Sequence, residues 1–174
     1  MNQWVELTAL ISILSAIMFG EAGVLHDDTS AKMVGHIYMN RYISSKFYDP
    51  YDERSREVQA AGGFCAYPLI FGKGTVPNHY IELAHDVYVE HKVMGLDPSD
   101  GCFWVTSWDD VSSLAYIYAP YYRYNAEWKS PRRVLDGVVY QLYVFREWDF
   151  SRPDFDYDYE GLLKSLDIVP LEEW

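Results

Sequence analysis

Residues 4–22 read WVELTALISILSAIMFGEA, and this stretch decides the first element of the fold. Apolar side chains recur along it at helical spacing, and Glu6 is the only charged residue before Glu21. We therefore expect a helix over 4–20 whose apolar face lies in the core. Such a helix requires other amphipathic elements to cover it.

Glu21 continues the apolar line of this helix. Leu7, Leu14 and Glu21 are seven residues apart, so they fall on nearly one line, beside apolar neighbours. Apolar surroundings disfavour the charged form of a carboxyl group, and we expect the pKa of Glu21 to rise. A raised pKa suits a general acid in glycosidic-bond cleavage. The plainer alternative is that Glu21 ends the helix and turns to solvent.

Length and charge limit the function. A chain of 174 residues suits one domain with a proper core and is too short for two ordinary ones. Aromatic residues make up 17%, a share that suits a packed core and also sugar-binding clefts. The formal net charge of −12 argues against a nucleic-acid partner, because no basic surface is available for phosphates.

The apolar segment over 7–18 resembles the core of a secretion signal. No Lys or Arg precedes it, however, and Glu6 lies just in front, so we recognise no signal peptide. The segment is also short and interrupted for a membrane span. We expect a core helix and no span. Cys65 and Cys102 are expected to be two buried thiols, and they could form a disulfide only if the fold brings them together.

The remaining elements predict an α+β fold, mainly helical with a small β-sheet lobe. Asp28, Thr29 and Ser30 are candidate N-caps of a second helix, and the cation of Arg41 suits its last turn. The elements expected after the first helix are a second helix over 28–44, a helical piece over 54–60, a third long helix over 77–95, and strands over 102–106 and 138–145.

The third helix carries His79, His85 and His91, six residues apart. At this spacing the side chains point in different directions, and no zinc motif accompanies them. We expect core or surface histidines there, with no metal and no cofactor.

Residues 149–174 form an acidic, aromatic extension to a domain over 1–148. Eight acidic residues stand there against Arg152 and Lys164, a net charge of −6 and half of the total. The extension is either a solvated tail packed on the domain or a docking segment for a protein partner.

Five motifs occur in an order that resembles the SleB-like cell-wall hydrolases, which include the spore-cortex-lytic enzymes. The resemblance spans roughly residues 7–146 and leaves the acidic extension uncovered. The motifs are Phe19-Gly-Glu-Ala22, Met39-Asn-Arg41, Gly63-Phe-Cys-Ala-Tyr67, Asp97-Pro-Ser-Asp-Gly-Cys-Phe-Trp104 and Val139-Tyr-Gln-Leu-Tyr-Val-Phe-Arg146.

The resemblance implies a lysozyme-like domain that cleaves peptidoglycan glycan strands between N-acetylmuramic acid and N-acetylglucosamine. Glu21 matches the catalytic glutamate of the family, whose members look like lytic transglycosylases. In that chemistry one carboxyl group protonates the glycosidic oxygen and then acts as base, while the muramic 6-hydroxyl closes an anhydro ring.

The chain departs from the family at a second carboxylate. Leu25 stands where the family often has another Glu, and Asp27 and Asp28 are nearby substitutes. Hydrolysis and transglycosylation therefore both stay open. Gly63 and Cys65 also replace the usual Gln and Ser, which bears on the sugar subsites.

In a lysozyme-like fold, the positions beside Glu21 are expected to line the substrate cleft. These residues are Phe64, Tyr67, Trp104 and Thr106. Core packing is an equal alternative for the aromatic residues. Asn40 and Arg41 are expected to brace the loop of the catalytic glutamate instead of touching sugar.

A different class of function is a non-catalytic lysozyme-like structural or virion component that docks through its acidic extension. A peptidase or amidase ranks last, because Cys65 has no evident histidine pairing and zinc spacing is absent. Action at the bacterial cell wall without a recognised signal peptide fits a phage lysis enzyme, a virion-associated protein or an enzyme exported by another route.

Overall fold

The computed structural model describes residues 3–64, 74–107, 126–136 and 138–146. Contacts divide the chain into two compact units, residues 1–103 and 104–174. The described part of the first unit is helical, and that of the second holds antiparallel strands, so the chain has the expected α+β class. The finer lysozyme-like arrangement stays a prediction. Tyr67, Cys65 and the acidic extension lie outside the described residues.

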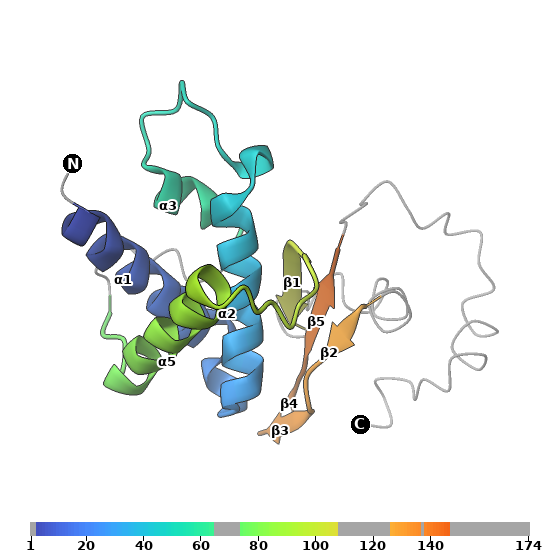
Figure 1. Cartoon of the computed structure of the whole chain (residues 1–174). Helices are drawn as coiled ribbons and strands as arrows, with labels where there is room; N and C mark the ends of the chain where they lie inside the picture. Colours follow the sequence, from blue (N-terminus) through green and yellow to red (C-terminus); the bar gives the residue numbers. More distant parts are fainter. Residues whose placement is uncertain (1–2, 65–73, 108–125, 137, 147–174) are drawn as a thin grey trace, which may run out of the picture. The chain divides into compact units, whose positions relative to one another are not determined.

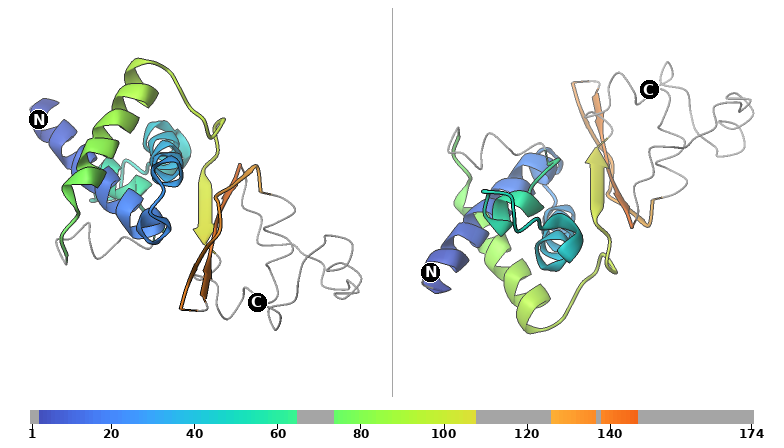
Figure 2. Two further views of the ribbon diagram at one scale, coloured as in Figure 1. Left: turned by 90° about the horizontal axis from the view of Figure 1, so that it is seen from below. Right: turned by 90° about the horizontal axis from the view of Figure 1, so that it is seen from above.

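Helices α1 (Gln3–Ala22), α2 (Asp28–Ile43) and α5 (Asn78–Tyr88) pack against one another pairwise to form the core of the first unit (Figures 1 and 2). The apolar face expected for the first helix is buried there. Helix α1 runs two residues further than expected, so Glu21 lies in its last turn and not beyond its end. The fully buried side chains of the three helices include Leu14, Ile17, Met18, Val34, Ile37, Tyr38, Met39 and Val87.

Helix α1 is also the one helix of the described chain with the length and composition of a membrane span, over Glu6–Leu25. By length and composition alone this helix could cross a bilayer, although the apolar segment over 7–18 led us to expect no span. However, 56% of the stretch is buried inside the unit. This burial suits a core helix and is compatible with no membrane span.

The N-cap of α2 is Asp27, and not Asp28, Thr29 or Ser30 as expected. The Asp27 backbone is extended, and its side chain accepts a hydrogen bond of 2.9 Å from the Ser30 backbone N–H. The Ser30 hydroxyl donates to the same carboxylate oxygen. Asp27 thereby satisfies a donor that the first turn of a helix leaves unpaired.

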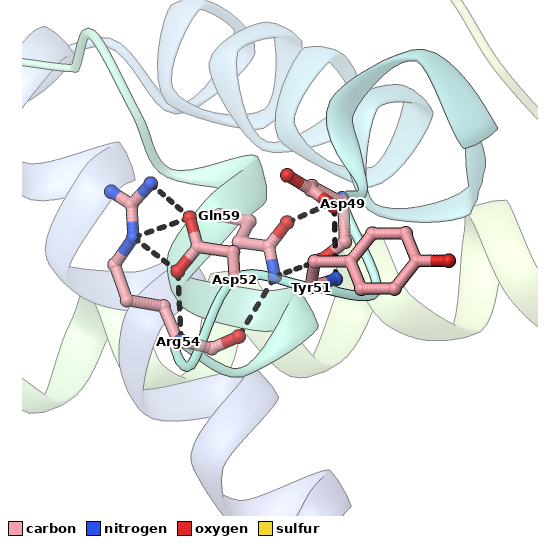
Figure 3. A network of polar contacts seen from close by, with 5 residues as sticks. All are labelled: Asp49, Tyr51, Asp52, Arg54 and Gln59. Carbon is pink, nitrogen blue, oxygen red and sulfur yellow. Dashed lines mark hydrogen bonds and ion pairs between the residues drawn. The ribbon is translucent and has the colours of Figure 1, made fainter.

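The loop between α2 and α3 (Arg56–Ala60) is held by its own polar side chains (Figure 3). Gln59 accepts from the Asp49 backbone N–H at 2.7 Å, and its amide nitrogen donates to the carbonyls of Asp49 and Arg54. The guanidinium of Arg54 binds both carboxylate oxygens of Asp52, and these hydrogen bonds lower the pKa of Asp52 to about 2. The loop thus keeps its shape without an apolar core.

Helix α5 passes directly into a π-helical segment, η3 (Val89–Val93). The Met94 backbone N–H bonds to the Val89 carbonyl at 3.0 Å, five residues back, and Gly95 at φ 69 ends the segment. This end agrees with the expected helix over 77–95. The wider π turn was not expected, and it changes the direction in which the residues after Tyr88 point.

The described strands form two antiparallel sheets. Strands β1 (Trp104–Ser107), β5 (Leu142–Phe145) and β2 (Trp128–Lys129) follow the order β1-β5-β2, and β3 (Arg133–Leu135) pairs with β4 (Val138–Tyr140). All four β5 side chains are buried, as expected for a strand apolar on both faces.

The first strand begins at Trp104, two residues later than expected. Side chains of α2 bind the backbone just before it: Asn40 donates to the Cys102 carbonyl and Arg41 to the Phe103 carbonyl. These carbonyls are therefore engaged outside the sheet, and the ladder starts after them.

The expected strand over 138–145 is two strands, separated at Gln141. Lys129 pairs with Tyr143, and Arg133 pairs with Tyr140. The chain therefore advances four residues from β2 to β3 but only three from β4 to β5 between the same two pairs. This extra residue is a bulge that includes Pro131, which has no N–H to donate to a ladder. The Gln141 side chain instead donates to the Ser130 carbonyl at 2.8 Å.

We expect Gly35→Ala to destabilise the first unit. A Cβ at this position would lie 3.0 Å from the Met18 sulfur and 3.1 Å from both Val87 methyl groups. The overpacking cost of about 1–3 kcal/mol exceeds the gain of up to about 1 kcal/mol in helix propensity. Urea denaturation would measure the change, with Gly20→Ala at an exposed position of α1 as the matched control. A stabilised Gly35→Ala protein would contradict this close approach of helices.

Candidate functional site

Glu21 and Arg41 are buried at the ends of the two longest helices. Glu21 lies in the last turn of α1 and is 6% exposed, and Arg41 lies in the last turn of α2 and is 2% exposed. The alternative in which Glu21 turns to solvent at a helix end is therefore wrong. The two side chains interact through their opposite charges.

The guanidinium of Arg41 gathers backbone and aromatic groups from distant parts of the first unit. It donates from Nε to the Phe103 carbonyl and from Nη1 to the Gly62 carbonyl, the latter at 2.8 Å. Its Cζ lies 4.2 Å from the ring centroid of Phe64 and 5.2 Å from that of Phe47, in the turn η2 (Ser45–Phe47). A planar guanidinium suits this combination of fixed hydrogen bonds and ring faces.

Arg41 keeps its positive charge at neutral pH. Burial lowers the pKa of Arg41 to about 10, and the negative charge of Glu21 acts in the opposite direction. The attraction stabilises the charged form of Arg41. The site therefore holds a cation beside its buried carboxyl group.

Asn40 holds the turn that leads into Phe103. Its amide nitrogen donates to Asp97 Oδ2 and Ser99 Oγ, both at 2.9 Å, and to the Cys102 carbonyl at 3.0 Å. Burial alone would raise the pKa of Asp97, but hydrogen bonds from Ser99 and Asn40 outweigh it, and the pKa is lowered. Asn40 and Arg41 thus fix consecutive pieces of one segment, and their role beside a catalytic glutamate stays a prediction.

The residues expected in the cleft fall in different parts of the chain. Phe64 lies in the first unit and is 5% exposed. The Arg41 guanidinium lies over its ring, and the ring also makes an edge-on contact with the ring of Tyr38. Trp104 and Thr106 belong to β1 of the second unit and are partly exposed. Tyr67 lies outside the described residues. Arg41 thus links Glu21 and Phe64, while sugar contact by the four residues stays a prediction.

The nearby carboxylates considered as substitutes for a second catalytic group have other partners. Asp27 caps α2, and Asp28 Oδ1 lies 2.7 Å from Nε2 of His79 at the surface. Leu25 is buried in the 3₁₀ turn η1 (Gly23–Leu25). The other buried acidic side chain of the described residues is Glu57 in α3, which the sequence analysis did not consider.

A second polar cluster, which the sequence analysis missed, lies at the end of α5. His36 of α2 has no exposed surface, and its Nδ1 lies 3.0 Å from Nδ1 of His91 in η3. Its Nε2 lies 3.2 Å from Glu90 Oε2. The sequence analysis expected a core or surface histidine at His91, and it did not foresee the pairing with His36 on another helix.

Burial controls the protonation of this histidine pair. It lowers the pKa of His36 against the effect of the Glu90 hydrogen bond, and it lowers the pKa of His91 against the effect of the Asp97 charge. Both shifts favour neutral imidazole.

Compared with protein-family models, with curated proteins and with solved structures, the chain gives no match. Function must therefore be argued from the site itself.

We expect Arg41→Lys to destabilise the protein by about 2–4 kcal/mol. Lysine cannot reach both carbonyls in the geometry of the guanidinium, so a buried acceptor loses its partner while a buried charge remains. Urea denaturation would measure the loss. Arg54→Lys in the exposed loop is the matched control and should leave the midpoint unchanged. Equal effects of the two substitutions would contradict the role of Arg41.

Asn40→Asp should destabilise the protein more than Asn40→Ala at neutral pH. Removing the amide leaves buried acceptors unpaired and costs about 1–3 kcal/mol. The aspartate would in addition bring a second negative charge to the carboxylate of Asp97, which now accepts from Asn40 at 2.9 Å. Thermal unfolding of both variants at neutral pH would give the order. The reverse order would show that the Asp97 carboxylate does not face position 40 in solution.

Proposed function

We propose that the protein is a peptidoglycan-degrading glycosidase that cleaves the bond between N-acetylmuramic acid and N-acetylglucosamine. Within this class we propose a lytic transglycosylase with Glu21 as its acid and base. The resemblance to the SleB-like hydrolases suggests the substrate, and the surroundings of Glu21 support the chemistry. Peptidoglycan would be met at the bacterial cell wall, as a phage lysis or virion-associated enzyme or as an exported one.

The observation that carries the proposal is a carboxyl group buried in the last turn of an apolar helix and 6% exposed. A general acid needs a defined position against the glycosidic oxygen, and packing supplies it. Arg41, held by two backbone carbonyls, adds a fixed positive charge. That charge stabilises the carboxylate left after the proton has been given to the leaving sugar, and by the same attraction it opposes the protonated form from which a general acid starts.

Transglycosylation is favoured over hydrolysis by the partners of the neighbouring acids. Hydrolysing glycosidases ordinarily use a second carboxylate, either as nucleophile or to activate water. Asp27 is committed to a helix cap and Asp28 to His79, and Leu25 has no carboxyl group. A reaction in which the substrate's own 6-hydroxyl attacks needs only Glu21.

Aromatic and hydroxyl side chains supply candidate sugar contacts. We propose that Phe64, Tyr67, Trp104 and Thr106 line the subsites, since aromatic faces stack on sugar rings and hydroxyls bind their edges.

Digestion of purified peptidoglycan tests the proposal. The wild type should release muropeptides with 1,6-anhydromuramic ends, read by mass spectrometry, and Glu21→Gln should lose about 10²-fold or more of this rate. Glu57→Gln removes the other buried carboxyl group of the described residues and is the matched control. It should keep its activity, with thermal unfolding showing that both variants are folded.

Other products would redirect the proposal. Reducing muramic ends from the wild type would make the protein a hydrolase and would require a second catalytic carboxylate. If the wild type releases nothing from several wall types, the protein is instead a non-catalytic structural or virion component. Equal activity of Glu21→Gln and the wild type would remove Glu21 from the mechanism.

A further inference from the structure

Three segments of the first unit bring metal-binding atoms of three residues together. His36 lies on α2, His91 on η3, and Asp97 in the turn after Gly95. One side-chain donor atom from each of the three lies within 4.8 Å of the others. His36 is fully buried and the other two are partly exposed, so the cluster extends from the interior to the surface.

We infer that His36, His91 and Asp97 form a binding site for a divalent transition-metal ion of the Zn²⁺ type. Two imidazole nitrogens on one zinc ion, at about 2.0–2.1 Å each and a tetrahedral angle, are about 3.3–3.4 Å apart. The two Nδ1 atoms lie 3.0 Å apart, so a small opening of the pair admits the ion. Two imidazoles and one carboxylate suit zinc and its neighbours better than calcium or magnesium, which prefer oxygen.

The neighbours of His36 orient it as a ligand. Glu90 Oε2 lies 3.2 Å from His36 Nε2, and the ammonium of Lys32 donates to Glu90 Oε1 at 2.6 Å. A proton on Nε2, shared with this carboxylate, leaves the lone pair of Nδ1 directed toward His91. A carboxylate behind a histidine is the usual outer support of such a metal ligand.

Asp97 is held in position by donors from its own turn and from α2. Its Oδ1 accepts from the Ser99 N–H and hydroxyl, and its Oδ2 from Asn40 and the Gly101 N–H. The Ser99 hydroxyl is the donor that can rotate away without moving the backbone, and this rotation frees a lone pair for the ion. With three protein ligands in place, one position is left for water.

The inference does not depend on the proposed glycosidase activity. The ion would tie α2 to η3 and to the turn over 97–101, and none of its ligands is Glu21 or Arg41. A metal site with no wall-degrading activity, or the reverse, is therefore an interpretable result.

Zinc and cobalt binding to the full chain tests the site. After dialysis against Zn²⁺ and gel filtration, elemental analysis should give one equivalent for the wild type. Zinc at about 100 times its dissociation constant should raise the melting temperature by about 5–10 °C. Co²⁺ should give visible absorption bands. His91→Ala should lose all three signals, and His79→Ala, which removes the exposed His–Asp pair, should keep them.

A measurement on the wild type alone covers the case in which His91→Ala does not fold. Of the five histidines, only His36 and His91 should show shifted imidazole ¹⁵N resonances with Zn²⁺. Absence of those shifts, no stoichiometric zinc, or equal zinc binding by His91→Ala would overturn the inference. The pair would then be a hydrogen-bonded histidine dyad and nothing more.

Discussion

The first unit depends on the buried charge of Arg41. A guanidinium with 2% exposure must have its donors satisfied, because an uncompensated charge in the interior is strongly destabilising. The carbonyls of Gly62 and Phe103 and the rings of Phe47 and Phe64 meet this need. Those four groups come from three separate loops. One side chain therefore determines where the chain must lie after α2, after α3 and before β1, and Glu21 is set beside the same charge.

Helix α2 is unusual in its polar interior. His36, Asn40 and Arg41 are all buried on it, and each reaches a segment far away in sequence. Apolar burial supplies most of the stability of a three-helix core, but it tolerates sliding and repacking. Hydrogen-bonded polar groups do not tolerate such sliding, because a shift leaves a donor or acceptor unpaired. The polar face of α2 thus specifies the positions of the loops, while the apolar faces of α1 and α5 supply the stability.

The helices were predictable from local patterns, and the polar clusters were not. Apolar periodicity located α1 and α2 within a few residues, and Pro77 and Gly95 marked the ends of the α5–η3 segment. The burial of Glu21 followed from its seven-residue spacing with Leu7 and Leu14. The N-cap of α2 was missed by one position, since Asp27 and Asp28 are equivalent candidates until backbone angles are known. The pairing of His36 with His91 joins residues 55 apart, which no local pattern reports. The break at Gln141 arose from a bulge on the opposite strand, beyond the residues that defined the expected strand.

The π-helical turn η3 has a consequence for how the chain could have acquired its histidine cluster. A π turn holds one residue more than an α turn over the same length, so inserting a single residue into a regular helix produces it. The apolar positions Leu83, Ala84 and Val87 lie upstream and keep their packing through such an event. His91 lies within η3 and Asp97 follows it, so an extra residue at the start of η3 changes the direction in which His91 points relative to the core. The apolar packing of α5 and the position of His91 therefore depend on different parts of the same helix, the first on the α-helical turns and the second on the π turn.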